Sequence, residues 1–277
     1  MRFEKELNFA MDTASKAGKL LMNYHGKQNE PEWATPTNFK IVVDKMSDDL
    51  IFSEIRREFP EDDIYSEERN PFDRGRSRKW VYDPVDGTIP YTIHQSDNFS
   101  VAIGLVVDET PILGIVYMPK RDELYRAIIG EGSFCNGYSI RVSEQDNINR
   151  AVVGLDEGKE TIYYRRTSFT PIMSKLNSPE GIAVSVRSAC ASACLCQVAS
   201  GKPNNNLPLI GRLEAYLGHS LEPWDMAATV PIIREAGGIV THFSGEEWKF
   251  SRMNEGDPSI LAANSILHKK LVDLINV

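Results

Sequence analysis

The stretch W-V-Y-D-P-V-D-G-T-I-P-Y at residues 80–91 places two aspartates, Asp83 and Asp86, at the end of an apolar run. A glycine and a threonine, Gly87 and Thr88, follow directly. Like charges repel, and a buried carboxylate is costly unless something compensates for it. The stretch therefore indicates a functional site at the end of a buried strand, where a cation could balance the two acids.

Two further acids extend this interpretation. Glu67 follows the strand-like run D-I-Y-S, and Asp225 opens the helical pattern W-D-M-A-A-T-V-P-I-I-R-E-A-G-G at 224–238. Taken singly, each acid is explained by a turn, a solvated surface pair or a helix N-cap. Taken together, they can converge only if their repulsion is offset, and Mg²⁺ is bound by a few carboxylates with water and substrate phosphate. Two such ions suit in-line displacement at phosphorus.

Gly87 and Thr88 predict the complementary half of the site. Their backbone N–H groups stand at the start of an expected helix, which is a ready site for an anion. Pro90 fits the first turn of that helix, where no hydrogen-bond donor is lost. Acids for a metal ion beside amides for a phosphate predict a metal-dependent phosphatase.

The N-terminal half, 1–147, is predicted to hold two helices followed by a largely antiparallel sheet. The predicted helices cover 3–24 and a segment from Asp44 or Ser47 to Phe59, with a loop at 25–40 between them. Strands are expected at 63–66, 79–83, 99–108, 110–118 and 123–129, and N-G at 136 and 137 predicts a tight hairpin.

The C-terminal half, 148–277, alternates between strand and helix patterns, which favours an α/β arrangement. Strands are expected at 151–156, 183–186, 213–217, 238–243 and 259–264. Helices are expected within 168–177 and at 189–200, 224–236 and 265–275. A loop at 201–211 interrupts the alternation; it could reshape the pocket, be a surface insertion or touch a dimer partner.

Bulk properties exclude several classes of protein. The formal net charge of -8 argues against sequence-independent binding of nucleic acid. No apolar run reaches the roughly 18 residues of a membrane span, and the N-terminus is no signal peptide, so a cytoplasmic protein is expected. The cysteines are expected to be buried free thiols rather than a zinc site: Cys135, Cys190, Cys194 and Cys196.

Three motifs together resemble the inositol monophosphatase family. W-V-Y-D-P-V-D-G-T is similar to its D-P-[I/L]-D-G-T motif, Y-S-E-E to its G-E-E motif, and P-W-D-M-A-A-T-V-P-I-I-R-E-A-G-G to its W-D-x-A-A-G…E-A-G-G motif. Their order and separation match over nearly the whole chain. The resemblance implies a five-layer α-β-α-β-α sandwich, usually dimeric, which hydrolyses phosphomonoesters with two or three Mg²⁺ ions, and which lithium often inhibits.

The resemblance also implies roles for individual residues. The implied metal ligands are Glu67, Asp83 and the Val85 carbonyl for a first ion, and Asp83, Asp86 and Asp225 for a second. The implied positions for phosphate and substrate are Asp86, Gly87, Thr88, Ala189, Cys190 and Gly218. The implied catalytic residues are Asp44, Glu67 and Thr88, with Asp44 paired to the Thr88 hydroxyl and helping to activate the attacking water. No covalent intermediate is expected.

The sequence departs from the family pattern around the substrate rather than around the metal. The family often has glycine where Ser66 stands, threonine at Ile41, x-Asn-aromatic at Ile89-Pro90-Tyr91, Gly-Ser or Gly-Thr at Ala189-Cys190, and, in inositol-hydrolysing members, glutamate at Gly218. The metal ligands therefore match the family and the sugar-reading residues do not.

Several alternatives remain open from the sequence. Within the family, relatives act on inositol phosphate, histidinol phosphate, fructose bisphosphate and adenosine bisphosphate, and a catalytically silent relative that binds a sugar phosphate is a further alternative. The haloacid dehalogenase phosphatases carry D-x-D-G-T, but their acids lie two positions apart rather than three. An EF-hand calcium loop needs acids at alternating positions, which D-P-V-D-G-T lacks.

Overall fold

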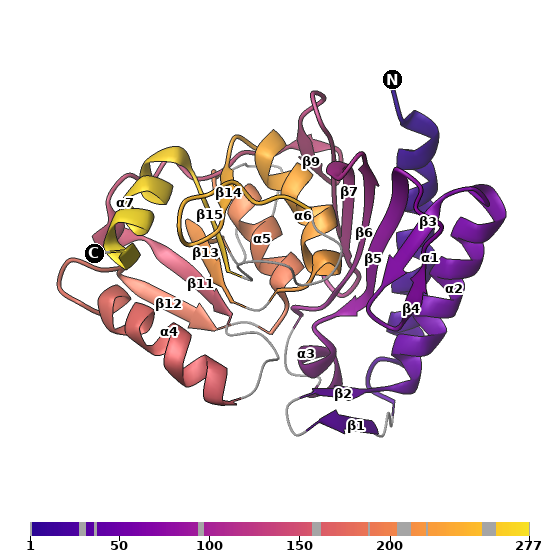
Figure 1. Cartoon of the computed structure of the whole chain (residues 1–277), viewed down its shortest axis with the longest axis horizontal. Helices are drawn as coiled ribbons and strands as arrows, with labels where there is room; N and C mark the ends of the chain where they lie inside the picture. The colour runs from indigo at the N-terminus through magenta and orange to yellow at the C-terminus, as the bar shows by residue number, and fades with distance from the viewer. Residues whose placement is uncertain are drawn as a thin grey trace.

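The computed structural model of the chain describes residues 2–27, 32–35, 38–93, 97–156, 162–187, 189–203, 212–219, 221–250 and 259–276. Helices and sheets alternate in five layers (Figure 1). Helices α4 (Ile162–Leu176) and α7 (Ser265–Asn276) form one outer layer, and α1 (Glu4–Tyr24) and α2 (Val42–Glu58) form the other. The predicted α-β-α-β-α sandwich is confirmed.

The larger sheet has the strand order β10-β9-β8-β7-β6-β5-β3-β4 in the described part of the chain. Neighbouring strands pair antiparallel, except that β3 and β5 pair in parallel. Its strands are β3 (Asp63–Ser66), β4 (Arg69–Phe72), β5 (Arg78–Asp86), β6 (Ser100–Val107), β7 (Thr110–Met118), β8 (Glu123–Ile128), β9 (Ser133–Cys135) and β10 (Tyr138–Ser139). This arrangement agrees with the antiparallel sheet that the sequence predicts for the first half.

The smaller sheet has the order β12-β11-β13-β15-β14 among the described residues. Strand β11 pairs in parallel with β12 and with β13, and β15 runs antiparallel to both of its neighbours. Its strands are β11 (Val152–Asp156), β12 (Val184–Arg187), β13 (Ala215–Gly218), β14 (Ile239–Thr241) and β15 (Ile260–Ala263). The short 3-10 helix η1 (Ile148–Arg150) precedes β11. The division into halves at residue 147 stays a prediction.

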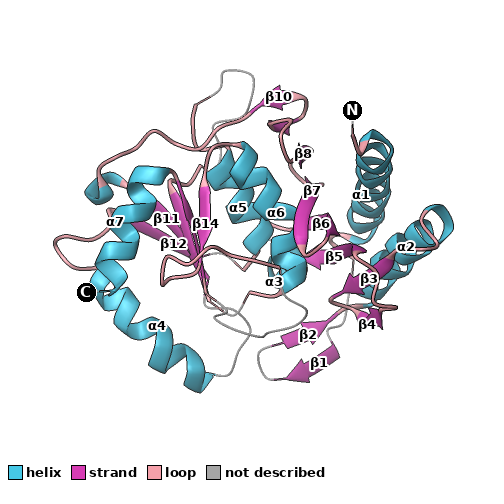
Figure 2. Ribbon diagram, turned by 45° about the horizontal axis from the view of Figure 1, so that its top comes forward, coloured by secondary structure: helices cyan, strands magenta, loops and turns pink. Residues whose placement is uncertain are grey.

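Helices α5 (Ala191–Ala199) and α6 (Pro223–Glu235) lie between the two sheets, as Figure 2 also shows. Every side chain of α5 is buried, and its small residues suit a helix that packs on both sides. One apolar cluster surrounds α5 and α6, a second joins α1 and α2 to the larger sheet, and a third joins α4 and α7 to the smaller one. The middle layer thus packs the two sheets together and brings the starts of α5 and α6 to the larger sheet.

The structure corrects the sequence prediction at several elements. The segment expected to be a loop, 25–40, contains a two-stranded antiparallel sheet of β1 (Glu32–Thr35) and β2 (Asn38–Lys40), because proline and polar residues oppose a helix without opposing a hairpin. Strand β4 was not predicted, and helix α4 begins earlier than expected. Most of the 201–211 loop, residues 204–211, lies outside the described residues.

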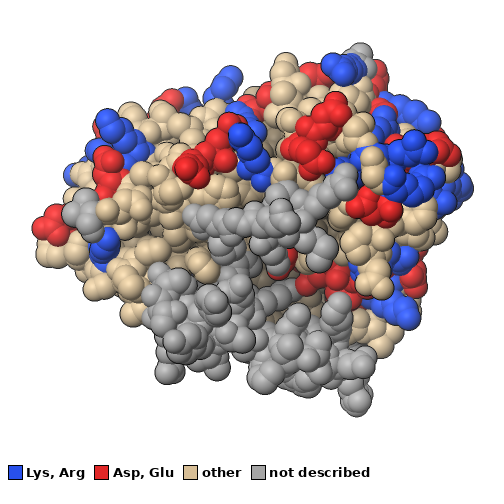
Figure 3. Space-filling model, viewed as in Figure 1, with Lys and Arg blue, Asp and Glu red and all other residues tan. Residues whose placement is uncertain are grey.

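Charged residues of both signs are scattered over the face drawn in Figure 3, and lysines and arginines gather beside α2 and β4. These cations take part in ion pairs: Arg57 contacts Glu54 at 2.7 Å, and Arg69 contacts Asp49 at 2.7 Å. Within the described ranges, no helix is both long enough and apolar enough to cross a membrane.

Candidate active site

A bulge at the end of β5 turns Asp83 and Asp86 toward one side of the larger sheet. Side chains three positions apart in a regular strand point to opposite faces. Here Asp83 pairs with Ala102 and Asp86 with Ser100, so three steps along β5 match two along β6. Such a bulge inserts one residue and redirects the side chains beyond it. Because of the bulge, two aspartates three positions apart can point to the same side of the sheet and form one cluster.

Asp225 reaches the same place from the first turn of α6. Pro223 begins the helix, and one Asp225 oxygen accepts a hydrogen bond from the Glu222 N–H at 3.0 Å. This bond fixes the carboxylate at the positive end of the helix, where a negative charge is stabilised. The same bond orients the rest of the carboxylate relative to β5.

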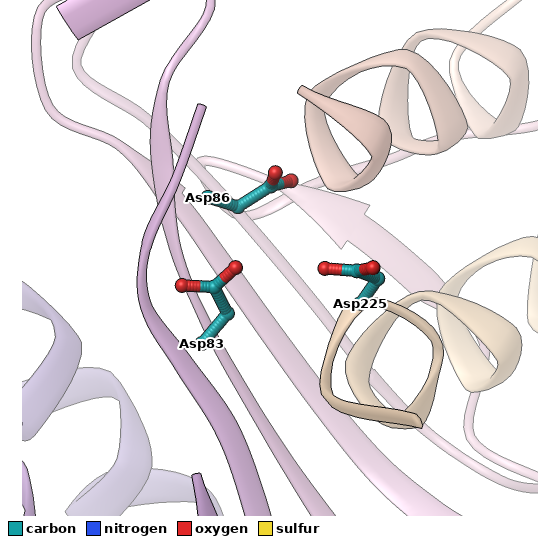
Figure 4. A group of neighbouring side chains, drawn as sticks. All are labelled: Asp83, Asp86 and Asp225. Carbon is teal, nitrogen blue, oxygen red and sulfur yellow. The ribbon is translucent and has the colours of Figure 1, made fainter. Parts of the chain in front are cut away.

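Asp83, Asp86 and Asp225 each offer an oxygen atom, and these atoms lie within 4.8 Å of one another. Figure 4 shows the three side chains pointing toward a common point from β5 and from the start of α6. Asp83 and Asp86 are 2% and 7% exposed, so their repulsion is weakly screened by water. Carboxylate oxygens are the ligands that hard divalent cations prefer, and the donor set therefore fits Mg²⁺.

Glu67 lies beside Asp83 but outside this group of three acids. Strand β3 ends at Ser66, which pairs in parallel with Tyr82 on β5. Glu67 follows Ser66 and Asp83 follows Tyr82, so the two acids stand at the same level of neighbouring strands. The predicted role of Glu67 as a metal ligand stays a prediction, as does that of the Val85 carbonyl. That carbonyl accepts the Thr88 hydroxyl at 3.2 Å and has a second lone pair for a cation.

A buried carboxylate that the sequence analysis missed supports the end of β3. Asp48 in α2 accepts hydrogen bonds from the Ser66 and Tyr82 hydroxyls, both at 2.7 Å, and from the Arg69 Nε at 2.6 Å. Burial, and then Asp48, raise the pKa of Tyr82 well above its ordinary value. Ser66, which departs from the family glycine, therefore links β3 to α2 directly before Glu67. No local pattern marks Asp48, because its partners come from three other segments.

Asp44 is buried at the start of α2, but its predicted bond to Thr88 is wrong. The Asp44 carboxylate accepts the Ile41 N–H at 2.9 Å, which is a capping interaction. The single proton of the Thr88 hydroxyl is donated to Val85 instead. The reason is local: Thr88 is the first residue of α3 (Thr88–Ile93), and its side chain folds back on the turn that precedes the helix. The predicted catalytic roles of both residues stay predictions.

Any residue other than glycine at position 87 would force the neighbouring atoms to move. Gly87 has φ 87°, which favours glycine, and a Cβ there would lie 2.8 Å from the Asn98 carbonyl oxygen and 2.9 Å from the Cys190 Cβ. The Tyr91 N–H closes the first turn of α3 on the Gly87 carbonyl at 3.0 Å. The predicted helix start after the acids is confirmed, and its use for phosphate stays a prediction.

The residues at the start of α5 contact the acids directly. Cys190 is the fully buried N-cap of α5, and its Sγ lies 3.2 Å from Asp86 Oδ2; Ala189 is exposed. Burial, with Asp86, raises the pKa of the Cys190 thiol, so it remains protonated and can donate. Ser192, which the sequence analysis did not single out, also binds Asp86. The four cysteines expected to be thiols form no disulfide, and all are buried.

Gly218 stands where the sequence lacks the family glutamate, and Tyr216 fills the space beside it. A Cβ at Gly218 would lie 2.8 Å from the Tyr216 ring and 2.9 Å from Leu221. Tyr216 is fully buried, and its hydroxyl makes no hydrogen bond in the described part of the structure. Burial, and then Asp156, raise its pKa well above the ordinary value, so the hydroxyl stays neutral. A glutamate at 218 would therefore require Tyr216 to move.

Replacing Tyr216 by phenylalanine is expected to raise the free energy of unfolding by about 1 kcal/mol, because it removes a buried hydroxyl without a partner. Tyr82→Phe is the matched control, since it removes a buried hydroxyl that donates to Asp48. The control should lower the same free energy by about 1–2 kcal/mol. Urea unfolding of both variants measures whether each substitution raises or lowers the free energy of unfolding. Loss of stability in both would mean that the Tyr216 hydroxyl is bonded in solution.

Comparison with known proteins agrees with this geometry. The sequence model of the inositol monophosphatase family matches residues 3–276. A fructose-1,6-bisphosphatase/inositol-1-monophosphatase of Thermotoga maritima is 32% identical, over 98% of this chain and 95% of that protein. A histidinol-phosphatase of Chlorobaculum parvum is 30% identical, over 98% and 96%. The solved inositol monophosphatase of Anabaena superimposes with a TM-score of 0.82 at 27% identity, over 100% and 97%.

These matches cover the whole architecture rather than one motif, and they favour the metal-dependent interpretation over the haloacid dehalogenase and EF-hand alternatives. The buried acids, the bulged strand and the helix start occur in a fold shared with solved inositol monophosphatases. The chain therefore belongs to the inositol monophosphatase family, whose members are metal-dependent phosphatases that hydrolyse phosphomonoesters.

Proposed function

We propose that this chain hydrolyses the phosphomonoester of a small metabolite with Mg²⁺, through direct attack of water on phosphorus. The observation that carries the proposal is the convergence of Asp83, Asp86 and Asp225 within 4.8 Å from two elements far apart in the sequence. Without a cation the repulsion among these carboxylates opposes folding. Glu67 and the Val85 carbonyl complete the proposed ligand set.

Bound Mg²⁺ would supply charge neutralisation at the phosphate and a lowered pKa for water at the site. The amides of Gly87 and Thr88 orient the phosphate. The Thr88 oxygen, whose proton is donated to Val85, can accept a hydrogen bond from the attacking water. Glu67 and Asp44 are the proposed acceptors of its proton. The water oxygen forms a bond to phosphorus as the bond to the alcohol oxygen breaks, the leaving oxygen takes up a proton from solvent, and no phosphoenzyme forms.

The family relatives support a small-metabolite substrate without identifying one. Curated relatives named fructose-1,6-bisphosphatase/inositol-1-monophosphatase and histidinol-phosphatase supply the first candidates. Gly218 itself carries no carboxylate, and Tyr216 and Leu221 fill the space beside it. We therefore expect inositol 1-phosphate not to be the preferred substrate.

The decisive experiment is phosphate release with Mg²⁺ from inositol 1-phosphate, histidinol phosphate, fructose bisphosphate, adenosine bisphosphate and p-nitrophenyl phosphate. Turnover of at least one natural ester, abolished by a chelator, supports the proposal. A folded chain that binds Mg²⁺ and releases no phosphate from any of them would support the catalytically silent alternative. Adding lithium tests the expected inhibition.

Addition of Mg²⁺ is expected to raise the melting temperature, because the ion binds a preformed cluster of acids in the folded chain. At a hundredfold excess over its dissociation constant the gain is about 2.7 kcal/mol, or roughly 5 °C for a chain of this length. A chelator should reverse the shift and leave the circular dichroism signal at 20 °C unchanged, because the core clusters form without the ion. Loss of that signal would contradict the expectation.

We also infer a cytoplasmic homodimer that binds neither nucleic acid nor membrane. The free cysteines support a reducing compartment, the net charge of -8 opposes nucleic-acid binding, and the family resemblance supports the dimer. Light scattering on the purified chain tests the oligomeric state.

A further inference from the structure

Asp86 is bound at one oxygen by residues from the start of α5. The Ser192 N–H donates to Asp86 Oδ2 at 2.7 Å, and the Ser192 hydroxyl contacts the same oxygen. The Cys190 thiol donates to that oxygen as well, at 3.2 Å. These donors come from a segment about a hundred residues beyond Asp86. The carboxylate is thus tied to the middle layer of the sandwich as well as to its own strand.

The direction of the hydrogen bonds follows from the chemistry of the groups. An ionised carboxylate only accepts, so the Ser192 hydroxyl must donate its single proton to Asp86. Ser100 Oγ lies 2.6 Å from Ser192 Oγ, and Ser100 must therefore donate to Ser192. Ser100 is also the residue that pairs with Asp86 across β5 and β6. A directed chain from Ser100 through Ser192 to Asp86 results, and both serines are fully buried.

These hydrogen bonds give the two oxygens of Asp86 different roles. An amide, a hydroxyl and a thiol donate to Oδ2, so little capacity remains there for a cation. Asp86 also offers one oxygen to the group that it forms with Asp83 and Asp225, whose ligand atoms lie within 4.8 Å of one another. The donors that crowd Oδ2 favour Oδ1 for that role. Groups that bind a metal-ligating carboxylate from behind fix its orientation and tune its affinity for the ion.

We propose that Ser192, supported by Ser100, is a positioning residue that holds Asp86 for one-oxygen coordination of the metal ion. This inference rests on the proposed metal-dependent function. The Ser192 hydroxyl acts through Asp86 and does not touch the substrate. Its removal leaves the Ser192 N–H and Cys190 thiol bonds to Asp86 in place but holds the carboxylate less tightly.

Binding of Mn²⁺ as a stand-in for Mg²⁺, followed by electron paramagnetic resonance of the free ion without any substrate, tests the proposal. Ser192→Ala is expected to weaken binding about tenfold, at the lower end of such effects because the Ser192 N–H and the Cys190 thiol still donate to Asp86. Ser192→Thr restores the hydroxyl and should bind Mn²⁺ more tightly than Ser192→Ala. Ser133→Ala is the matched control, because Ser133 is equally buried and its hydroxyl makes no hydrogen bond among the described residues.

A second measurement separates positioning from a structural role. In Ser192→Ala the Mg²⁺ concentration for half-maximal phosphate release should rise about tenfold, with kcat at saturating Mg²⁺ and the KM for substrate near wild type. Melting temperatures of the variants without metal show whether each is folded.

Three results would overturn the proposal. The first is wild-type Mn²⁺ affinity in Ser192→Ala, and the second is an equal loss of affinity in Ser133→Ala. The third is a changed KM with unchanged metal binding, which would place Ser192 in the substrate pocket. Because Mn²⁺ binding is read without substrate, a wild-type chain that hydrolyses no ester contradicts the proposed function and leaves the Ser192 result interpretable by itself.

Discussion

Replacing Asp83 by asparagine is expected to lower Mg²⁺-dependent phosphate release by about three orders of magnitude or more. A metal ion supplies several kcal/mol of transition-state stabilisation, and about 4 kcal/mol corresponds to this factor. One Asp83 oxygen accepts the Val85 N–H at 2.8 Å. The asparagine carbonyl would keep that bond, so its amide NH₂ would face the cluster and present protons where a cation needs a lone pair.

The same substitution should leave the metal-free protein at least as stable as wild type. Asp83 is nearly fully buried beside two other acids, and its neutral isostere relieves their repulsion. The matched control is Asp63→Asn on neighbouring β3. Asp63 is also fully buried, but it accepts the Arg74 and Arg76 N–H groups away from the cluster. The control should lose stability and keep phosphate release.

Phosphate release and urea unfolding, measured on both variants, test the prediction. Turnover of Asp83→Asn within tenfold of wild type at saturating Mg²⁺ would remove Asp83 from the metal site. A large loss of stability in metal-free Asp83→Asn would show that the carboxylate has a structural role instead.

Much of the fold could be predicted because its elements are marked by local patterns. The runs D-I-Y-S and T-P-I-L-G-I-V-Y-M coincide with β3 and β7, since each is an apolar run between turn residues. Helix α1 follows its apolar spacing from Glu4 to Tyr24. Strands β1, β2 and β4 were not predicted, because they are short and carry polar residues or proline.

The acids of the site and the helix start at Thr88 could be predicted, but the contacts that hold them could not. Asp83, Asp86 and Asp225 lie in motifs, and the structure brings them together. The bulge that turns Asp83 and Asp86 to the same side depends on how β5 pairs with β6. The sequence of β5 alone does not indicate this pairing. Ser192 could not be found by spacing, because it reaches Asp86 across 106 residues of sequence. Long-range contacts of this kind follow from tertiary packing, which local propensity does not encode.

A glycine pair on the larger sheet sets how closely α6 approaches and therefore where Asp225 lies. Gly104 in β6 and Gly114 in β7 are directly opposite each other. A Cβ at Gly104 would lie 2.6 Å from the backbone carbon of Ala227, and a Cβ at Gly114 only 1.8 Å from the Ala228 carbonyl oxygen. Both contacts are with the α6 backbone, directly after the turn that holds Asp225. The absence of two side chains lets the helix lie against the strands.

Gly114→Ala is therefore expected to push α6 away from the sheet by about 1 Å, because a backbone atom cannot rotate aside. Overpacking of a buried contact costs about 3 kcal/mol at the upper end of its usual range. A displacement of about 1 Å at an active site can lower the rate by about a hundredfold. We expect both effects, together with weaker Mn²⁺ binding, because Asp225 moves away from Asp83 and Asp86.

The control for Gly114→Ala is Gly130→Ala, at a position where a Cβ would meet no atom within 4 Å. Gly130 has φ 86°, so alanine there costs about 1–2 kcal/mol through backbone strain alone. That variant should lose some stability and keep both Mn²⁺ binding and phosphate release. If Gly114→Ala is no less stable than Gly130→Ala and binds Mn²⁺ as tightly, the sheet tolerates a side chain under α6. The position of Asp225 would then depend on the first turn of the helix rather than on the glycine pair.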